Sequence, residues 1–208
     1  MKMLLVYGTT EGQTEKISKY VANCLAQRGH QYVLMNASGS TRAADVRDFD
    51  AVIIAASVHA GRYQPAIIHY VREHLAAIGG RPNAFLSVSL AAAGDNEDDG
   101  DGLKKCVADF ARETKWTPQN VHHVAGALRY TSYNLLTRWA MQYIAYRKGG
   151  PTDASRDYEL TDWADLGRFV DLLVNRVEFA SAGLPGCGFS VNGQIPDTRA
   201  VEPRAGFT

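Results

Sequence analysis

The chain has 208 residues, 46% of them hydrophobic, which suits one domain with an appendage and is enough to bury a full core. Its 22 basic and 22 acidic side chains balance, so the formal net charge at pH 7 is zero. A neutral chain offers nucleic acid no global field, so we expect no nucleic-acid partner, and any charge-driven partner must meet a local patch.

The stretch from Leu4 to Thr14 predicts a buried strand that runs into a binding loop and then into a helix. Its first half is a continuous apolar run, as in a strand covered on both faces of a parallel sheet. Gly8 allows a sharp turn, and Gly12 lets the backbone pass close to a ligand. A helix from Thr14 to Arg28 would bring its positive end and the N–H groups of the loop to one point, which predicts an anion site.

The kind of anion follows from what this loop lacks. A P-loop requires a lysine where Gln13 stands, and no Gly-x-Gly-x-x-Gly follows the strand, which removes a dinucleotide site of the Rossmann type. What remains is a phosphomonoester held by neutral donors, with like charge turning the Glu11 side chain away from it. The residues expected to form this site are Thr9, Thr10, Glu11, Gly12, Gln13 and Thr14.

Apolar strands and amphipathic helices alternate along the rest of the chain. Strands are expected at 30–36, 51–56, 83–90 and 121–128, and helices at 65–75 and 103–114. A last helix should begin at a capping Thr161. Its buried stripe is expected to consist of Leu166, Phe169, Val170 and Leu173. This alternation predicts an α/β fold with a doubly wound, five-stranded parallel sheet. We place the domain at 1–177 and a Gly- and Pro-containing tail at 178–208.

The acidic segment at 95–102 resembles the start of a calcium-binding EF-hand loop. Position twelve of such a loop needs a bidentate glutamate, but Cys106 stands there. We therefore expect no metal, and interpret the segment as a solvated loop whose last acidic side chains favour the N-terminus of the next helix.

Cysteine usage and hydropathy indicate the compartment. Cys24, Cys106 and Cys187 form no Cys-x-x-Cys pair, which is typical of a reducing environment. No apolar run approaches the ~20 residues of a membrane span, and no signal peptide precedes the first strand. We expect a cytoplasmic protein, with peripheral attachment to the inner face of the cell membrane left open.

The stretch at 115–152 is locally basic, with five Lys or Arg and no Asp or Glu. Within it, the residues from Tyr133 to Arg147 have the pattern of an amphipathic helix. A five-stranded sheet does not need this helix between its fifth strand and its last helix, so we interpret about 129–150 as an insertion. The pattern leaves open whether the helix packs on the sheet, covers a ligand or meets a bilayer surface.

The phosphate loop resembles that of flavodoxins, which bind FMN through a Thr/Ser-x-Thr-Gly-x-Thr loop after the first strand. Here the loop departs at Glu11, which replaces a usual threonine. Further stretches narrow the resemblance to the menaquinone-dependent protoporphyrinogen IX dehydrogenases. They are Ala56-Ser57 with Gly61 and Tyr63, Ser87-Val88, Ala125-Gly126-Ala127-Leu128-Arg129-Tyr130, Gly149-Gly150 with Thr152-Asp153, and Thr161-Asp162-Trp163. They extend over residues 1 to about 177, with departures at His59-Ala60 and in the acidic segment.

The resemblance implies the strand order 2-1-3-4-5 with FMN as the cofactor. It also implies oxidation of protoporphyrinogen IX to protoporphyrin IX, with a quinone, either menaquinone or ubiquinone, as the electron acceptor. In that topology the loops at 57–63 and 89–94 border the flavin ring. Their expected cofactor contacts are Ser57, Val58, His59, Gly61, Ser89, Leu90 and Ala91. These loops offer fewer aromatic side chains than many flavodoxins stack on the ring, which suits a substrate that lies against it.

The propionates of such a substrate need cations. The expected substrate contacts are Arg62, Tyr63, Arg129 and Arg138. His59 and Arg129 are the catalytic candidates: Arg129 lies in a matching segment, and the imidazole of His59 is suited to proton transfer near neutral pH. Two alternatives stay open, a flavodoxin-type electron-transfer protein and an FMN-dependent quinone reductase. Carrier flavodoxins are usually strongly acidic, and this chain is neutral.

Overall fold

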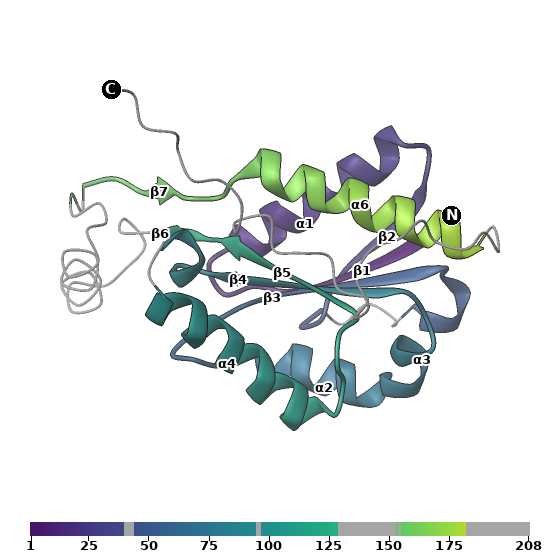
Figure 1. Cartoon of the computed structure of the whole chain (residues 1–208), viewed down its shortest axis with the longest axis horizontal. Coiled ribbons are helices and arrows are strands. Elements are labelled where there is room, and N and C mark those ends of the chain that lie inside the picture. The colour runs from purple at the N-terminus through teal and green to yellow at the C-terminus, as the bar shows by residue number, and fades with distance from the viewer. Residues whose placement is uncertain (40–43, 95–96, 129–152, 154, 182–208) are drawn as a thin grey trace, which may run out of the picture.

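A five-stranded parallel sheet forms the centre of the structure, a computed structural model that describes residues 1–39, 44–94, 97–128, 153 and 155–181 (Figure 1). Its strands are β1 (Lys2–Gly8), β2 (Gln31–Asn36), β3 (Ala51–Ser57), β4 (Asn83–Ser89) and β5 (Asn120–Ala125). They lie in the order β2-β1-β3-β4-β5, and all neighbouring pairs are parallel. The predicted doubly wound sheet and its strand order are confirmed.

The apolar runs in the sequence correspond to the central strands. β1, β3 and β4 are buried along almost their whole length, whereas β2 and β5 mix buried with partly or fully exposed positions. In register, Leu5 pairs with Ile53, and Ile54 with Phe85, and none of the four is more than 2% exposed. Central strands of a doubly wound sheet contact helices on both faces, so they contain no polar alternation.

Helices cover both faces of this sheet (Figure 1). One face carries α1 (Gln13–Gln27) and α6 (Trp163–Ser181), which contact each other. The other face carries α2 (Pro65–Glu73), α3 (Leu75–Gly79) and α4 (Glu97–Thr114). The predicted stripe of α6 is buried against α1 and the sheet. The helices thus hold the strands from both sides and leave the ends of the sheet to the loops.

Two helix boundaries differ from the prediction. α4 begins at Glu97, six residues before the predicted start at Leu103. The predicted solvated loop is therefore wrong over this part. The helix that starts at Pro65 stops at Glu73, and a separate short helix follows from Leu75.

The predicted cap of α6 is also wrong. Asp162 caps this helix, since its Oδ1 accepts a hydrogen bond from the N–H of Asp165 at 2.9 Å. The Thr161 hydroxyl donates instead to the carbonyl of Ala125 at 2.7 Å. α6 then continues to Ser181, past the expected domain boundary at residue 177.

The fifth strand is shorter than predicted. β5 ends at Ala125, and after Gly126 a separate strand β6 (Ala127–Leu128) pairs antiparallel with β7 (Tyr158–Glu159). These two strands flank the expected insertion in the sequence. The helix expected from Tyr133 to Arg147 lies outside the described residues, as do residues 182–208.

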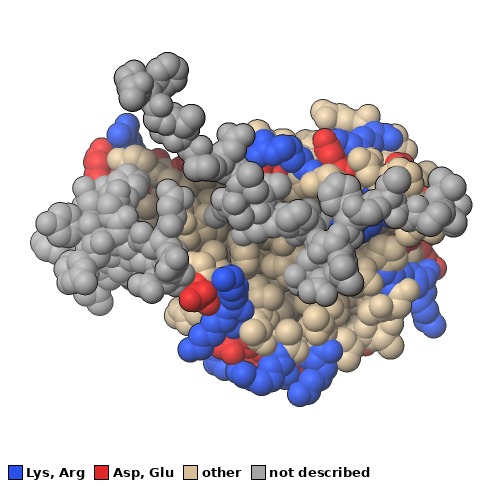
Figure 2. All heavy atoms as spheres, viewed as in Figure 1, with Lys and Arg blue, Asp and Glu red and all other residues tan. Residues whose placement is uncertain are grey.

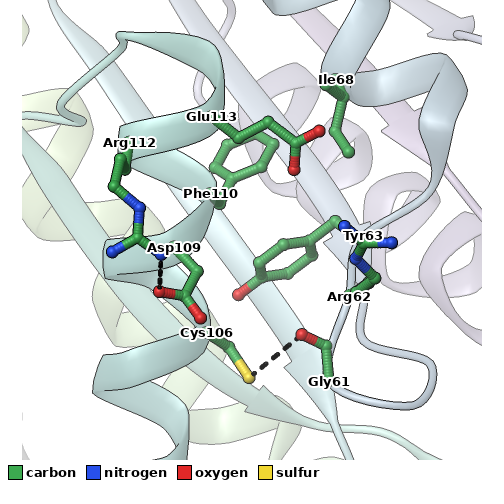
Figure 3. A pocket seen from close by; sticks show the side chains of 9 residues that line it. All are labelled: Gly61, Arg62, Tyr63, Ile68, Cys106, Asp109, Phe110, Arg112 and Glu113. Carbon is green, nitrogen blue, oxygen red and sulfur yellow. Dashed lines mark hydrogen bonds and ion pairs between the residues drawn. The ribbon is translucent and has the colours of Figure 1, made fainter.

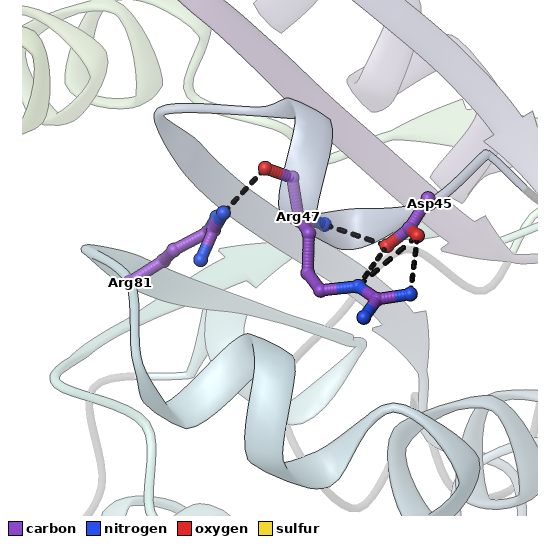
Figure 4. Close-up of polar contacts among 3 residues, drawn as sticks. All are labelled: Asp45, Arg47 and Arg81. Carbon is purple, nitrogen blue, oxygen red and sulfur yellow. Dashed lines mark hydrogen bonds and ion pairs between the residues drawn. The ribbon is translucent and has the colours of Figure 1, made fainter.

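Arginine contacts fix the amino ends of the central strands (Figure 4). Asp45 accepts hydrogen bonds from the side chain of Arg47 at 2.7 Å and from its N–H at 2.9 Å, and these bonds lower the pKa of Asp45 to about 2. Arg81 donates to the carbonyls of Arg47 and, at 2.6 Å, of Phe49. These residues precede β3 and β4, so their contacts lie at the amino ends of the strands. The carboxyl ends, where a ligand is expected, lie at the opposite edge of the sheet.

Basic and acidic side chains are interspersed around the face drawn in Figure 2, consistent with the zero net charge. Within the part of the chain that the structure describes, no helix has the length and apolar character needed to cross a membrane. The same residues contain no group of three or more His, Cys, Asp or Glu side chains that could hold a metal ion.

Candidate functional site

A hollow of about 320 Å³ opens at the carboxyl ends of the strands, and we call it the switch-point hollow. Ligands of open α/β sheets bind at this place, where the strand order reverses. The predicted cofactor residues that line it are Thr9, Glu11, Gln13, Thr14, Ser57, Val58, His59, Ser89, Leu90 and Ala91. The structure therefore brings the three predicted loops together.

The lining differs from the predicted set in a few positions. Thr10, Gly12 and Gly61 are not part of it, although each neighbours a residue that is. The lining residues that were not predicted are Ala60, Val88, Gly126 and Ala127. Gly126 and Ala127 were missed because the fifth strand was expected to continue to Leu128. Gly126 was the available signal, since a glycine inside a strand pattern often marks a bend or a close approach.

The end of the hollow nearest α1 has the features of a phosphate site. Gly12 precedes the helix with φ 85°, a conformation that a side chain would strain. Its N–H donates to Thr9 Oγ1 at 2.9 Å, which closes the loop. The N–H groups in the first turn of a helix have no carbonyl partner within that helix, and the helix dipole favours the charge of an anion bound there.

Thr14 gives the most specific indication of a ligand. This residue is 1% exposed, and its Oγ1 makes no hydrogen bond within the described part of the chain. An unpaired buried hydroxyl costs about 1–3 kcal/mol, so such atoms are rare. Ser18, one turn later in α1, has its hydroxyl bonded to the Thr14 carbonyl at 2.8 Å. A phosphate oxygen at the N-terminus of α1 would supply the partner that Thr14 lacks.

The charge of the lining also fits a phosphate held by neutral donors. Among the described residues that line the hollow there is no Lys or Arg, and Glu11 is the acidic one. Hydroxyls, N–H groups and the helix dipole therefore provide the attraction. These are the neutral donors that the sequence predicts for a phosphomonoester.

The part of the hollow that the segments after β3, β4 and β5 line is largely apolar. Its walls contain the apolar residues Val58, Ala60, Val88, Leu90, Ala91, Gly126 and Ala127, together with the polar residues Ser57, His59 and Ser89. Backbone bonds hold these walls together, from Val58 N–H to the Val88 carbonyl at 2.8 Å and from Gly126 N–H to the Ser89 carbonyl at 3.0 Å. No Phe, Tyr or Trp is among the described lining residues. A planar ring placed here would keep one face available to a second molecule.

A tight turn after β3 separates this hollow from a second cavity. The N–H groups of His59 and Arg62 each donate to the carbonyl of the other, at 2.8 and 3.0 Å. Between them, Ala60 and Gly61 have φ of 48° and 77°, the combination found in a type I′ turn. His59 lines the switch-point hollow, whereas Gly61 and Arg62 line the second cavity.

The second cavity, which we call the charged groove, lies between this turn and α4 (Figure 3). It measures about 200 Å³, and its lining residues are Gly61, Arg62, Tyr63, Ile68, Cys106, Asp109, Phe110, Arg112 and Glu113. Arg112 pairs with Asp109 at 2.6 Å, and the Cys106 thiol lies 3.7 Å from the Gly61 carbonyl. Arg62 is exposed, and no side chain in the described part of the chain forms an ion pair with it.

Tyr63 belongs to the core beneath this groove. It is 5% exposed, its hydroxyl is hydrogen-bonded to Ser87 Oγ at 2.7 Å, and burial raises its pKa. Its ring contacts Phe85 and Phe110, with centroids 5.0 Å away in both cases. The structure thus places Tyr63, expected as a substrate contact, outside the switch-point hollow. The other two expected contacts, Arg129 and Arg138, lie outside the described residues.

A parallel sheet of this order, with a phosphate site after β1 and an apolar pocket beside it, defines the class of flavodoxin-like proteins. The family model described as a flavodoxin domain matches residues 4–155. The chain is 32% identical to protoporphyrinogen IX dehydrogenase (quinone) of Leishmania major, over 81% of this chain and 73% of that protein. It is 31% identical to the protein of the same name from Escherichia coli (strain K12), over 82% of this chain and 93% of that protein. The chain therefore belongs to the quinone-dependent protoporphyrinogen IX dehydrogenase family of the flavodoxin-like superfamily, as its motifs indicated.

Solved structures agree with this fold. A flavodoxin from the domain Archaea superimposes with a TM-score of 0.51 at 14% identity, over 86% of this chain and 99% of that one. Oxidised flavodoxin 1 from Bacillus cereus does so with a TM-score of 0.51 at 12% identity, over 84% and 98%. Membership of the flavodoxin family indicates that the cofactor is a flavin.

Proposed function

We propose that this chain is a dehydrogenase that uses FMN to oxidise protoporphyrinogen IX to protoporphyrin IX, with a quinone as the electron acceptor, in haem biosynthesis. Its relatives named for this reaction match about four fifths of the chain. Menaquinone and ubiquinone are the two acceptors that we consider. The protein is accordingly an oxidoreductase.

The observation that carries the choice of FMN is the buried hydroxyl of Thr14 at the N-terminus of α1, which has no hydrogen-bond partner in the part of the chain that the structure describes. One hydroxyl and one helix end suit a terminal phosphate better than a pyrophosphate, which needs the glycine-rich turn that this loop lacks. The apolar end of the hollow suits the isoalloxazine ring. Bound FMN would supply the exchange of electron pairs between the two substrates.

The task of the chain itself is to bind and orient the substrate. An uncovered ring face leaves space for a tetrapyrrole beside the cofactor. His59 is exposed on the rim of the hollow, where it is placed to accept the proton that a pyrrole nitrogen loses as the macrocycle is oxidised. Arg62 stands across the turn, no described side chain forms an ion pair with its guanidinium, and we assign it to a propionate. We propose Arg129 and Arg138 as contacts of the other propionate, and we also propose a catalytic role for Arg129.

A membrane contact completes the proposal. Quinones are lipophilic, and the segment from Tyr133 to Arg147 has an apolar half and basic residues, a pattern that suits the cytoplasmic surface of a membrane. The test compares sedimentation with anionic vesicles for the chain and for a variant in which 133–147 is a Gly/Ser linker. We expect the variant to stay in the supernatant, and equal sedimentation would contradict the assignment.

The reaction is tested by anaerobic reduction of the bound flavin with protoporphyrinogen, followed by reoxidation with menaquinone or ubiquinone. We expect the flavin absorbance to bleach and porphyrin fluorescence to rise together, and the absorbance to recover when quinone is added. If porphyrinogen leaves the flavin oxidised while NAD(P)H bleaches it, the chain is a quinone reductase. A colourless protein that gains no bound flavin on titration with FMN would contradict the choice of cofactor.

A further inference from the structure

The strand β6 contributes to one wall of the switch-point hollow, and β7 pairs with β6. Gly126 and Ala127 line the apolar end of the hollow, and Ala127 is paired with Glu159 of β7. The N–H of Leu160 donates to the Gly126 carbonyl at 3.0 Å, so the chain after β7 remains bonded to this wall. Residues more than thirty positions further along the sequence are therefore bonded to this part of the lining.

The same short segment is also bonded to the phosphate end of the hollow. Thr161 Oγ1 donates to the Ala125 carbonyl at 2.7 Å and accepts a hydrogen bond from Gln13 Nε2 at 2.9 Å. Gln13 is the first residue of α1, is 6% exposed, and lines the hollow. One hydroxyl thus bridges the end of β5 and the start of the phosphate-binding helix.

A second set of contacts lies one helical turn further along α1. The ammonium of Lys16 pairs with the carboxylate of Glu159, and its Nζ lies 5.3 Å from the ring centroid of Trp163. Trp163 Nε1 donates to the other oxygen of Glu159 at 2.7 Å. These contacts and the Thr161 bridge join α1 to the region of β6 and β7 at two levels.

We propose that Thr161 is a positioning residue that fixes the distance between the phosphate end and the ring end of the switch-point hollow, with Lys16 and Glu159 as its outer support. The inference rests on the proposed flavin site. Thr161 does not act as the helix cap, because Asp162 performs that role, so its hydroxyl is committed to Gln13 and Ala125. A ligand that occupies both ends needs the correct separation between them, whereas a ligand that occupies the ring end alone does not.

The test is the affinity of Thr161→Val for two flavins, FMN and riboflavin, measured by fluorescence quenching. Riboflavin lacks the phosphate and contacts only the ring end. We expect the Kd for FMN to rise roughly tenfold, as for the loss of one hydrogen bond, and the Kd for riboflavin to change less than twofold. Thr161→Ser keeps the hydroxyl and should restore the affinity for FMN. Thr114→Val is the matched control, because the hydroxyl of Thr114 also donates to a backbone carbonyl, at 2.8 Å, but in α4.

Two further measurements exclude a purely structural role. In a double-mutant cycle with Thr14→Val, Thr161→Val should add little, because the phosphate contact that it positions has already been removed. Glu159→Gln, on a partly exposed side chain, tests the outer support if Thr161→Val folds poorly, and should weaken FMN binding severalfold. Equal losses for FMN and riboflavin, additive effects in the cycle, or unchanged FMN binding in both variants would overturn the inference. Failure of the unmodified chain to bind FMN would overturn the proposed function together with it.

Discussion

The switch-point hollow and the charged groove lie on opposite sides of one turn, and their polar groups are arranged in opposite ways. In the groove, the Tyr63 hydroxyl is bonded to Ser87 Oγ and the Arg112 guanidinium to Asp109. In the hollow, Thr14 Oγ1 is buried with no partner in the described part of the chain. Among the described residues that line the two cavities, Thr14 is the one with a buried side-chain polar atom that has no partner, so the hollow and not the groove holds such a donor for a ligand.

Charge shows the same difference. Four charged side chains line the groove, Arg62, Asp109, Arg112 and Glu113, and of these Arg62 has no acidic partner among the residues that the structure describes. The described lining of the hollow contains no cation, so its attraction for an anion comes from helix and backbone dipoles. Arg62 is thus the group of the groove that is free to act on a molecule in the hollow. The variants below alter one side of the turn at a time.

Thr14→Val should have the largest effect on FMN binding, because it removes the hydroxyl that we assign to the phosphate. We expect the Kd for FMN to rise roughly 10- to 100-fold, the value of a hydrogen bond to a charged group. Without FMN the variant should be at least as stable as the parent, since an unpaired buried hydroxyl has been removed. Fluorescence titration and urea unfolding of the apo protein measure the two effects.

Ser18→Ala is the matched control in the same helix. Its hydroxyl is 2% exposed and already bonded to the chain, so its loss should lower the free energy of unfolding by about 1 kcal/mol and leave FMN binding unchanged. If Ser18→Ala weakened FMN binding as much as Thr14→Val, Thr14 would not be a phosphate contact.

Two buried tyrosines, Tyr63 at the groove and Tyr70 in the core outside both cavities, test whether the hydrogen bond of the Tyr63 hydroxyl stabilises the fold. Tyr63→Phe would leave Ser87 Oγ, 0% exposed, without the partner it has at 2.7 Å. We expect a loss of about 1–3 kcal/mol in the free energy of unfolding, with the affinity for FMN retained. Tyr70 is 6% exposed and its hydroxyl has no partner in the described part of the chain, so Tyr70→Phe should change stability little. Equal losses in urea unfolding of the two variants would contradict this distinction.

The comparison also shows which parts of the structure could be predicted from the sequence. The central strands were predictable because strands that are buried on both faces are rich in apolar residues. The phosphate loop was predictable because its chemistry depends on the local backbone and on the direction of the helix that follows it. The position of Tyr63 was not predictable in this way. A two-residue turn at Ala60 and Gly61 reverses the chain, so the side chain that follows enters the core instead of the ligand site.

Neighbouring residues of similar chemistry set another limit. Thr161 and Asp162 are both good capping residues, and only their tertiary surroundings decide between them. The carbonyl of Ala125 engages Thr161, and Asp162 is left to cap α6. The pair of strands β6 and β7 was missed for a related reason, because two-residue strands carry no periodicity that a sequence pattern can reveal.

Arg62→Ala tests the one group of the groove that we assign to the substrate. The KM for protoporphyrinogen should rise roughly two- to fivefold, the value of an exposed ion pair, while flavin content stays constant. Arg62→Lys should recover part of the loss. Arg72→Ala removes an equal charge from α2 at a residue that hydrogen-bonds the Glu113 carbonyl and lines neither cavity. A KM that responds equally to Arg62→Ala and Arg72→Ala would indicate a general effect of charge and not a propionate contact.

The smallest effects are expected in the turn that separates the two cavities. At Gly61, φ is 77° and an added Cβ would meet nothing within 4 Å, so Gly61→Ala is opposed by conformation alone and should cost about 1–2 kcal/mol. Ala60 already bears this strain at φ 48°. Ala60→Gly relieves it but increases the entropy of the unfolded chain by an amount worth about 0.5–1 kcal/mol, so the net gain should stay within about 1 kcal/mol.

Thermal unfolding of the two variants, measured without FMN, should therefore move in opposite directions. The reciprocal bonds between His59 and Arg62 do not depend on either side chain, so both variants should keep His59 at the hollow and Arg62 at the groove. The KM for protoporphyrinogen then serves as a second measurement, and we expect it to change less than it does in Arg62→Ala. If Ala60→Gly raised the KM as much as Arg62→Ala while stabilising the fold, the strain at Ala60 would itself hold the turn in its binding position.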